Sequence, residues 1–210
     1  GVDLPDLPMA EAEAEAVGTG CGAGYFKAQL LRGAEATRAG VKDAMQQATQ
    51  LIHVATHGLL ERRALALHDG LLDCDDLMGL QLRARLGVLS ACNTARGKVG
   101  ADGVMGLARS LMAAGVPSVV VSLWHIGDSS TAHFMRRFYE ECFTNGSPAH
   151  VALQTTMCKM IAARNGGFRR YYPCDWAAFV MLGPSMEGFC QSGGGGSSSA
   201  SAAADFPGGA

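Results

Sequence analysis

The sequence lacks long hydrophobic runs and any excess of charge of one sign. Its longest apolar stretches, such as residues 116–124, are much shorter than the roughly 20 residues of a membrane-spanning helix, and the N-terminus shows no signal-peptide pattern. The 17 Lys and Arg residues nearly balance the 19 Asp and Glu residues, and no block of basic residues occurs. These absences predict a soluble protein that binds neither nucleic acid nor a membrane surface.

Closely spaced cysteines are absent as well. The seven cysteines are scattered and odd in number, without a CxxC pair, which argues against a disulfide framework and favours a reducing, intracellular compartment such as the cytoplasm. His53 and His57 are four residues apart, and on a strand this spacing separates their rings by about 13 Å, too far for a shared zinc ion. Cys158 and Cys174 have no His or Cys close by in sequence, so we interpret both as structural. We therefore expect no metal site.

Glycine, in contrast, is abundant and concentrated in a few places. The chain has 28 glycines, and several of them fall in residues 18–24. No strand precedes this run and no acidic residue follows at the right distance, so it predicts a loop insertion and not a dinucleotide-binding turn. Residues 191–210 are almost entirely Gly, Ser and Ala, which predicts a flexible tail outside the fold. The domain is then expected to span residues 1–190.

The rest of the chain alternates between strand-like and helix-like patterns. Apolar runs predict strands over residues 26–31, 51–55, 86–90, 118–123 and 176–182. Helical spacing of apolar residues predicts helices over 11–17, 35–47, 102–114 and 149–163, and a further helix that Asp128 caps and that extends to Cys142. This alternation predicts an α/β sandwich with a mostly parallel sheet, in which functional residues lie beyond the carboxyl ends of the strands.

Two residues that can form a nucleophile and its base follow two of these strands. His57 comes just after the strand 51–55, and Cys92 just after the strand 86–90. If the two strands are parallel neighbours, the imidazole can take the thiol proton and leave a thiolate that attacks a carbonyl carbon. The backbone N–H groups of Gly58 and Cys92 could then form an oxyanion hole.

A structural interpretation of the same residues stays open at this point. A cysteine at the end of a core strand is commonly a small buried hydrophobic residue, and a histidine after a strand is commonly a loop residue bonded to backbone. The position of His57 and Cys92 at corresponding strand ends, each flanked by small residues, favours the dyad, but spacing alone does not decide between the two interpretations.

Several motifs in a fixed order resemble the CHAT domain family, whose caspase-like domains occur with tetratricopeptide repeats and are related to separase, gingipains and caspases. The similarity extends from about Leu4 to Gly183. The segments that carry it are residues 51–58, 88–94, 106–109, 113–115, 121–128, 138–139 and 176–179, together with the lead-in at 4–5, 11–13 and 31–37.

The resemblance implies a caspase-like three-layer sandwich and a cysteine endopeptidase of that clan, with His57 as general base and Cys92 as nucleophile. It implies no cofactor, a protein or peptide substrate, and tetratricopeptide or other regulatory segments in the full-length protein. The alternative is a catalytically silent CHAT module that serves protein interaction or signalling. Family members usually begin further upstream, so the resemblance also predicts that Gly1 starts a truncated domain that lacks an N-terminal edge portion of the sheet.

Three residues are candidates for the substrate pocket. Ser90 lies two residues before Cys92, where relatives that cleave after Arg or Lys often carry Asp, so this position does not support a basic preference. Trp124 ends a strand on the active edge and could form a pocket wall or pack in the core. Asp128 could supply an acid to the pocket or cap its helix.

Overall fold

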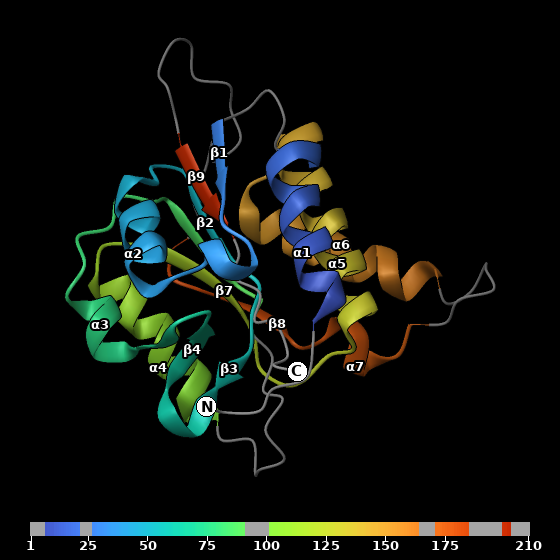
Figure 1. The fold of residues 1–210 in the computed structure, drawn as a ribbon. Helices are drawn as coiled ribbons and strands as arrows, with labels where there is room; N and C mark the ends of the chain where they lie inside the picture. Colours follow the sequence, from blue (N-terminus) through green and yellow to red (C-terminus); the bar gives the residue numbers. More distant parts are fainter. Residues whose placement is uncertain (1–6, 22–26, 91–100, 164–170, 185–198, 203–210) are drawn as a thin grey trace.

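The computed structural model describes residues 7–21, 27–90, 101–163, 171–184 and 199–202. A six-stranded sheet lies at the centre (Figure 1), with the strand order β1-β9-β2-β6-β7-β8. The strands are β1 (Lys27–Leu30), β9 (Ser199–Ala202), β2 (Leu51–Val54), β6 (Leu86–Leu89), β7 (Ser118–Ser122) and β8 (Phe179–Leu182). All neighbouring pairs are parallel except β7 and β8, which are antiparallel.

Helices cover both faces of this sheet (Figure 1). The helices α2 (Arg38–Gln47), α3 (Cys74–Met78) and α4 (Ala101–Ala113) cover one face, and α1 (Pro8–Glu15), α5 (Asp128–Tyr139) and α6 (Ala149–Ala163) cover the other. Alternate strand residues supply the two cores, so that Ile52 and Leu89 face the first helical layer while Leu51 and Val88 face the second. The predicted three-layer α/β sandwich with a mostly parallel sheet is confirmed.

Local sequence explains where several helices begin. Thr37 precedes α2 and its hydroxyl accepts a hydrogen bond from the Gly40 N–H at 3.1 Å. Asp73 and Asp76 form a capping box at the start of α3. The prediction that Asp128 caps its helix is wrong, because the extended residue Gly127 occupies the cap position and Asp128 is the first helical residue. The Gly127 carbonyl accepts bonds from Ser130 and Thr131.

Part of the chain between the second and third predicted strands folds into a small sheet that the sequence did not predict. It has the order β3-β4-β5 and is antiparallel, with β3 (Gly58–Leu59), β4 (Ala64–Leu67) and β5 (Gly70–Asp73). These strands are two to four residues long, too short to show the alternating pattern of a strand.

The short helices are α7 (Pro173–Trp176), the 3₁₀ turns η2 (Gly33–Glu35) and η3 (Leu60–Arg62), and the π-helical segments η1 (Ala16–Cys21) and η4 (Glu140–Thr144).

Both glycine-rich segments differ from expectation where the structure describes them. Residues 18–21 of the expected loop belong to η1, and residues 22–24 lie outside the described part of the chain. In the expected tail, Ser199–Ala202 form β9 between β1 and β2. Strand pairing uses backbone groups, so small side chains that bury little area can still join a sheet. The predicted strand 176–182 begins only at Phe179, because Pro173–Trp176 are helical.

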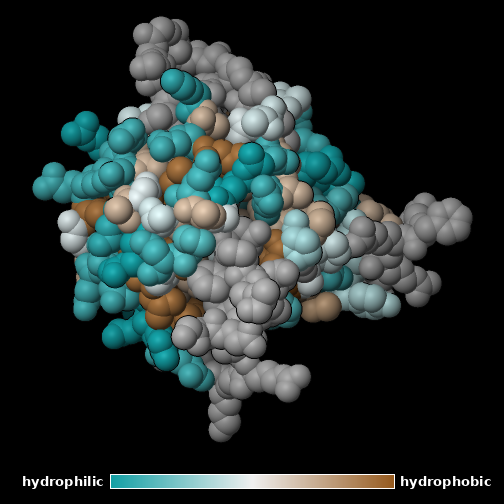
Figure 2. All heavy atoms as spheres, viewed as in Figure 1, coloured by the Kyte–Doolittle hydropathy of each residue, from teal (hydrophilic) through white to brown (hydrophobic). Residues whose placement is uncertain are grey.

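The surface in Figure 2 is mostly hydrophilic, with hydrophobic residues in small separate groups. Among the described helices, none has both the length and the apolar composition needed to cross a bilayer.

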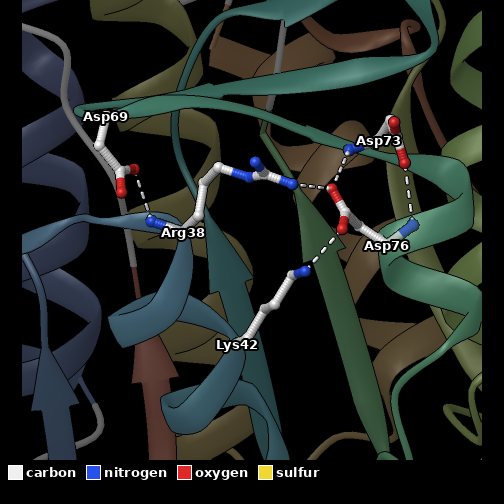
Figure 3. Close-up of polar contacts among 5 residues, drawn as sticks. All are labelled: Arg38, Lys42, Asp69, Asp73 and Asp76. Atoms are coloured by element: carbon white, nitrogen blue, oxygen red, sulfur yellow. Dashed lines mark hydrogen bonds and ion pairs between the residues drawn. The ribbon is translucent and has the colours of Figure 1, made fainter.

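A charged cluster joins α2 to α3 (Figure 3). The Asp76 carboxylate accepts from the Lys42 ammonium at 2.6 Å and from the Arg38 guanidinium at 2.7 Å. The hydrogen bond from Lys42 above all, and that from Arg38, hold the pKa of Asp76 below its usual range, although partial burial acts in the opposite direction. On the same helix α2, the Arg38 N–H donates to Asp69. The cluster therefore ties α2 to the β5–α3 segment.

Replacing Asp76 by Asn is expected to lower the free energy of unfolding by about 1 kcal/mol at pH 7, since it removes the charge that pairs with Lys42 and Arg38. A lowered native pKa stabilises the fold above the unfolded pKa, about 3.8, and this contribution to stability disappears as the pH falls through the native pKa. Urea unfolding from pH 7 down to about pH 3 should therefore show the difference between wild type and variant shrinking. Asp75→Asn, on the exposed side of α3, is the matched control; an unchanged Asp76→Asn difference at low pH would contradict the account.

Candidate active site

His57 lies beyond the carboxyl end of β2, beside the strand that leads to Cys92. β2 and β6 are parallel neighbours in which Val54 pairs with Leu89, and the pairing continues with a bond from the Ser90 N–H to the Val54 carbonyl at 2.8 Å. His57 is a buried residue, with an exposed fraction of 1%. The expectation that the two predicted strands are parallel neighbours is confirmed.

The small sheet fixes the backbone at His57. Ala66 of β4 donates its N–H to the His57 carbonyl at 2.9 Å, and its carbonyl accepts the Thr56 hydroxyl at 2.7 Å. Thr56 is itself buried. Thr56 and His57, which follow β2, are thus both bonded to Ala66 of β4. The sequence did not predict this role of Ala66, because it did not predict β4.

The same ladder orients the backbone of Gly58. Because the His57 carbonyl is bonded to the Ala66 N–H, the next pair, Gly58 and Leu65, occupies the non-hydrogen-bonded position of the antiparallel ladder. The N–H of Gly58 therefore points away from β4 and takes no part in the β3–β4 ladder. This direction is compatible with the predicted oxyanion donor.

Cys92 lies outside the described residues, which end at Ser90 on this side and resume at residue 101. Ser90 is the last described residue before it, and it is buried with 6% exposure. Among the residues that the structure describes, none offers a hydrogen-bond partner to the Ser90 hydroxyl. A buried hydroxyl without a partner costs free energy, so a ligand group that bonds to it would recover that cost.

The other two pocket candidates have different surroundings. Trp124 is partly buried against the core of the α5 and α6 layer, and its indole N–H donates to the Cys174 carbonyl of α7 at 3.1 Å. This places Trp124 in contact with the core, one of the two roles considered for it. Asp128 is the first residue of α5, and its side chain is not among those described. His125, next to Trp124, is exposed.

The described cysteines and acidic residues offer no further centre. Cys74 and Cys142 are buried thiols, whereas Cys158 and Cys174 are exposed thiols. In the described part of the chain, no group of three or more His, Cys, Asp or Glu side chains is placed to hold a metal ion. His53 is fully buried in the core, in contact with Glu13 and Tyr139, and the Glu13 contact could not be found from the sequence because forty residues separate the pair.

Replacing Thr56 by Val is expected to lower the free energy of unfolding by about 1–2 kcal/mol, because the buried Ala66 carbonyl loses the hydroxyl donor while the side-chain shape stays nearly the same. Thermal and urea unfolding would measure this loss. Thr144→Val, at an exposed position, is the control and should change stability by less than about 0.5 kcal/mol. Equal effects of the two substitutions would show that the bond to Ala66 contributes nothing.

Comparison with known proteins gives the same answer as the motifs and the fold. The family model described as CHAT domain matches residues 2–184. Tetratricopeptide repeat protein 28 of Mus musculus is 33% identical over 121 residues, and that of Homo sapiens is 34% identical over 121 residues. These matches cover 58% of the chain, which spans only 5% of the length of either relative. With a family match over most of its length, and with the predicted sandwich observed, the chain belongs to the CHAT domain family.

Proposed function

We propose that this CHAT domain is a cysteine endopeptidase in which Cys92 is the nucleophile and His57 the general base. The observation that carries the proposal is the position of His57 at the carboxyl end of β2, directly beside β6, the strand that leads to Cys92. Membership of a caspase-like, peptidase-related family supports it.

In the proposed reaction a ring nitrogen of His57 takes the proton from the Cys92 thiol, and the thiolate adds to the carbonyl carbon of a peptide bond. The N–H groups of Gly58 and Cys92 bond to the oxyanion that forms. The carbon–nitrogen bond then breaks as His57 gives its proton to the leaving amine, which leaves a thioester. Water, deprotonated by His57, hydrolyses the thioester and restores the thiol, so the reaction needs no cofactor.

The substrate pocket is proposed to include Ser90, Trp124 and Asp128. The unpartnered Ser90 hydroxyl supports the first of these, because a polar side chain of the substrate could bond to it. Ser90 carries no charge, so a preference for Arg or Lys would require another acid, for which Asp128 is the candidate. Trp124 would contribute an apolar wall next to its core contacts.

The burial of His57 favours a second candidate function. At 1% exposure, its ring does not meet a substrate unless the segment around it moves. A catalytically silent CHAT module that serves protein interaction or signalling would need no such movement, and the relatives are named for their tetratricopeptide repeats and not for an activity.

The proposed partners follow from the relatives and from the chemistry. A protein or peptide is the proposed substrate, and tetratricopeptide or other regulatory segments are the proposed neighbours in the full-length protein, as in the names of the relatives. A reducing compartment such as the cytoplasm is the proposed location, because the Cys92 thiol must stay reduced to react.

Cleavage of a peptide library by the wild type and by Cys92→Ala tests the proposal. The wild type should cut at a preferred residue, and Cys92→Ala should not, whereas Cys158→Ser, which changes an exposed thiol, should cut like the wild type. Equal cleavage by the wild type and Cys92→Ala would contradict the proposal, because the activity would then arise elsewhere. Absence of cleavage in all variants, with a folded domain, would favour the silent module.

A further inference from the structure

The buried face of helix α1 rests on the segment that leads to His57. Ala10, Glu13 and Ala14 are buried, and their spacing places them on one side of the helix. Ala10 and Ala14 form an apolar cluster with Ala55, which lies two residues before His57. Helix α1 therefore covers the residue that directly follows β2, in the segment that leads to the proposed base.

Glu13 extends this contact to His53, at the other end of the same segment. The side chains of Glu13 and His53 are 2% and 0% exposed, and the Glu13 Oε1 lies 3.0 Å from the His53 Nε2. The two polar atoms are in contact but do not meet the geometry of a directed hydrogen bond. The other ring nitrogen, Nδ1, lies 2.9 Å from the Tyr139 hydroxyl of α5. Two helices thus hold the His53 ring, one at each nitrogen.

Both helices change their hydrogen bonding beside this contact. α1 continues into the π-helical segment η1 at Ala16, and α5 continues into η4 directly after Tyr139. The segment η1 lies against both α5 and η4. Such π-helical turns are rare and frequently mark functional positions. The His53 contact therefore lies where the helical layer departs from regular geometry.

Helix α1 also packs against α5, but its own sequence does little to fix its position. It has eight residues, too few for a stable helix on its own, and no side chain caps its start. Its buried apolar residues are alanines, which bury little area. On its exposed side Glu11 and Glu15 pair with Arg32, and surface pairs of this kind contribute little. A buried polar side chain is costly without a polar partner, so the contact of Glu13 with His53 favours the observed position of α1.

We propose that Glu13 and His53 are positioning residues that fix α1 on residues 53–55 and thereby hold His57 in place. On the other side of the same segment, Ala66 of β4 bonds to Thr56 and to the His57 carbonyl. The segment that carries His57 is thus contacted by α1 at His53 and Ala55 and by β4 at Thr56 and His57, and displacement of α1 is expected to loosen it. The consequence for catalysis rests on the proposed function, whereas the placement of the His57 ring does not.

The test compares Glu13→Gln with Glu15→Gln, which makes the same change on the exposed side of the same helix. Glu13→Gln should speed amide hydrogen exchange in residues 51–57 by about tenfold and shift the ring ¹H–¹⁵N signals of His57, while Glu15→Gln leaves both unchanged. If Glu13→Gln does not fold, Glu13→Asp keeps the carboxyl group but shortens its reach to His53, and it should shift the same signals in the same direction.

The alkylation rate of Cys92 by iodoacetamide gives the catalytic consequence. In the folded Glu13→Gln variant it should fall about tenfold, towards the rate of an ordinary thiol. Unchanged His57 ring signals and exchange in a folded Glu13 variant would overturn the positioning role. A wild-type Cys92 whose alkylation does not depend on His57 would instead overturn the proposed function, and the positioning role would still be decided by the His57 signals.

Discussion

Replacing His57 by Ala is expected to lower the rate of peptide hydrolysis by about 10³-fold, provided that the wild type cleaves. In the proposed reaction the imidazole both takes the proton from the Cys92 thiol and returns a proton to the leaving amine, so its loss would affect every step of acyl transfer. Turnover of the best library peptide, measured near pH 7 for the wild type and the variant, gives the effect directly.

Two further variants separate chemistry from folding. His57 is buried, so the truncation to Ala also leaves a cavity, and His57→Gln keeps most of the volume while removing the base. His125→Ala removes the exposed histidine after β7 and should retain wild-type turnover. Retention of hydrolysis in His57→Gln, or loss of hydrolysis in His125→Ala, would show that His57 is not the general base.

Replacing Gly183 by Ala is expected to destabilise the fold by about 4 kcal/mol or more, which places it among the most damaging single substitutions. Gly183 follows β8 and has φ +96°, and an added Cβ would overlap the Pro117 carbonyl oxygen and lie 3.0 Å from the Ser118 Cα. Relief would require β8 to move, although its antiparallel pairing with β7 and the bond from the Ser118 hydroxyl to the Pro184 carbonyl hold it in place.

Gly146→Ala is the matched control for this clash. Gly146 has φ +66°, but no atom lies within 4 Å of an added Cβ, so only the backbone strain of about 1 kcal/mol remains. Calorimetry should therefore show a loss of melting temperature for Gly183→Ala of about 10 °C. Similar losses for both variants would mean that the close approach of Gly183 to Pro117 does not limit the fold.

Periodicity predicted the helices and strands that form the main body of the fold. The helix 149–163 matches α6, and the strands 51–55 and 86–90 differ from β2 and β6 by one residue at their ends, because each combines a strong apolar pattern with clear boundaries. The sheet β3-β4-β5 has no such pattern, since its pairing depends on contacts between residues brought together by the fold. For the same reason, nothing in the composition of Ser199–Ala202 indicated a strand between β1 and β2.

The candidate site likewise contains residues that the sequence predicts and residues whose role depends on contacts made only in the fold. His57 and Gly58 could be predicted because they follow directly on a strand, and the direction of that strand within the sheet is a general property of parallel α/β folds. The parts that hold His57 could not be predicted, because Ala66 lies on an unpredicted strand and Glu13 lies on a helix far away in sequence. A buried pair such as Glu13 and His53 has no sequence signature beyond its residue types.

The central claim, that His57 activates Cys92, is tested most directly by the rate at which each cysteine reacts with iodoacetamide, resolved by mass spectrometry. Cys158 and Cys174 are exposed thiols and supply the reference rate within the same molecule. Cys92 should react about tenfold faster than either near pH 7, and this excess should vanish in His57→Gln. A Cys92 that reacts no faster than Cys158 and Cys174, or that reacts equally fast without His57, would contradict the assignment of the pair.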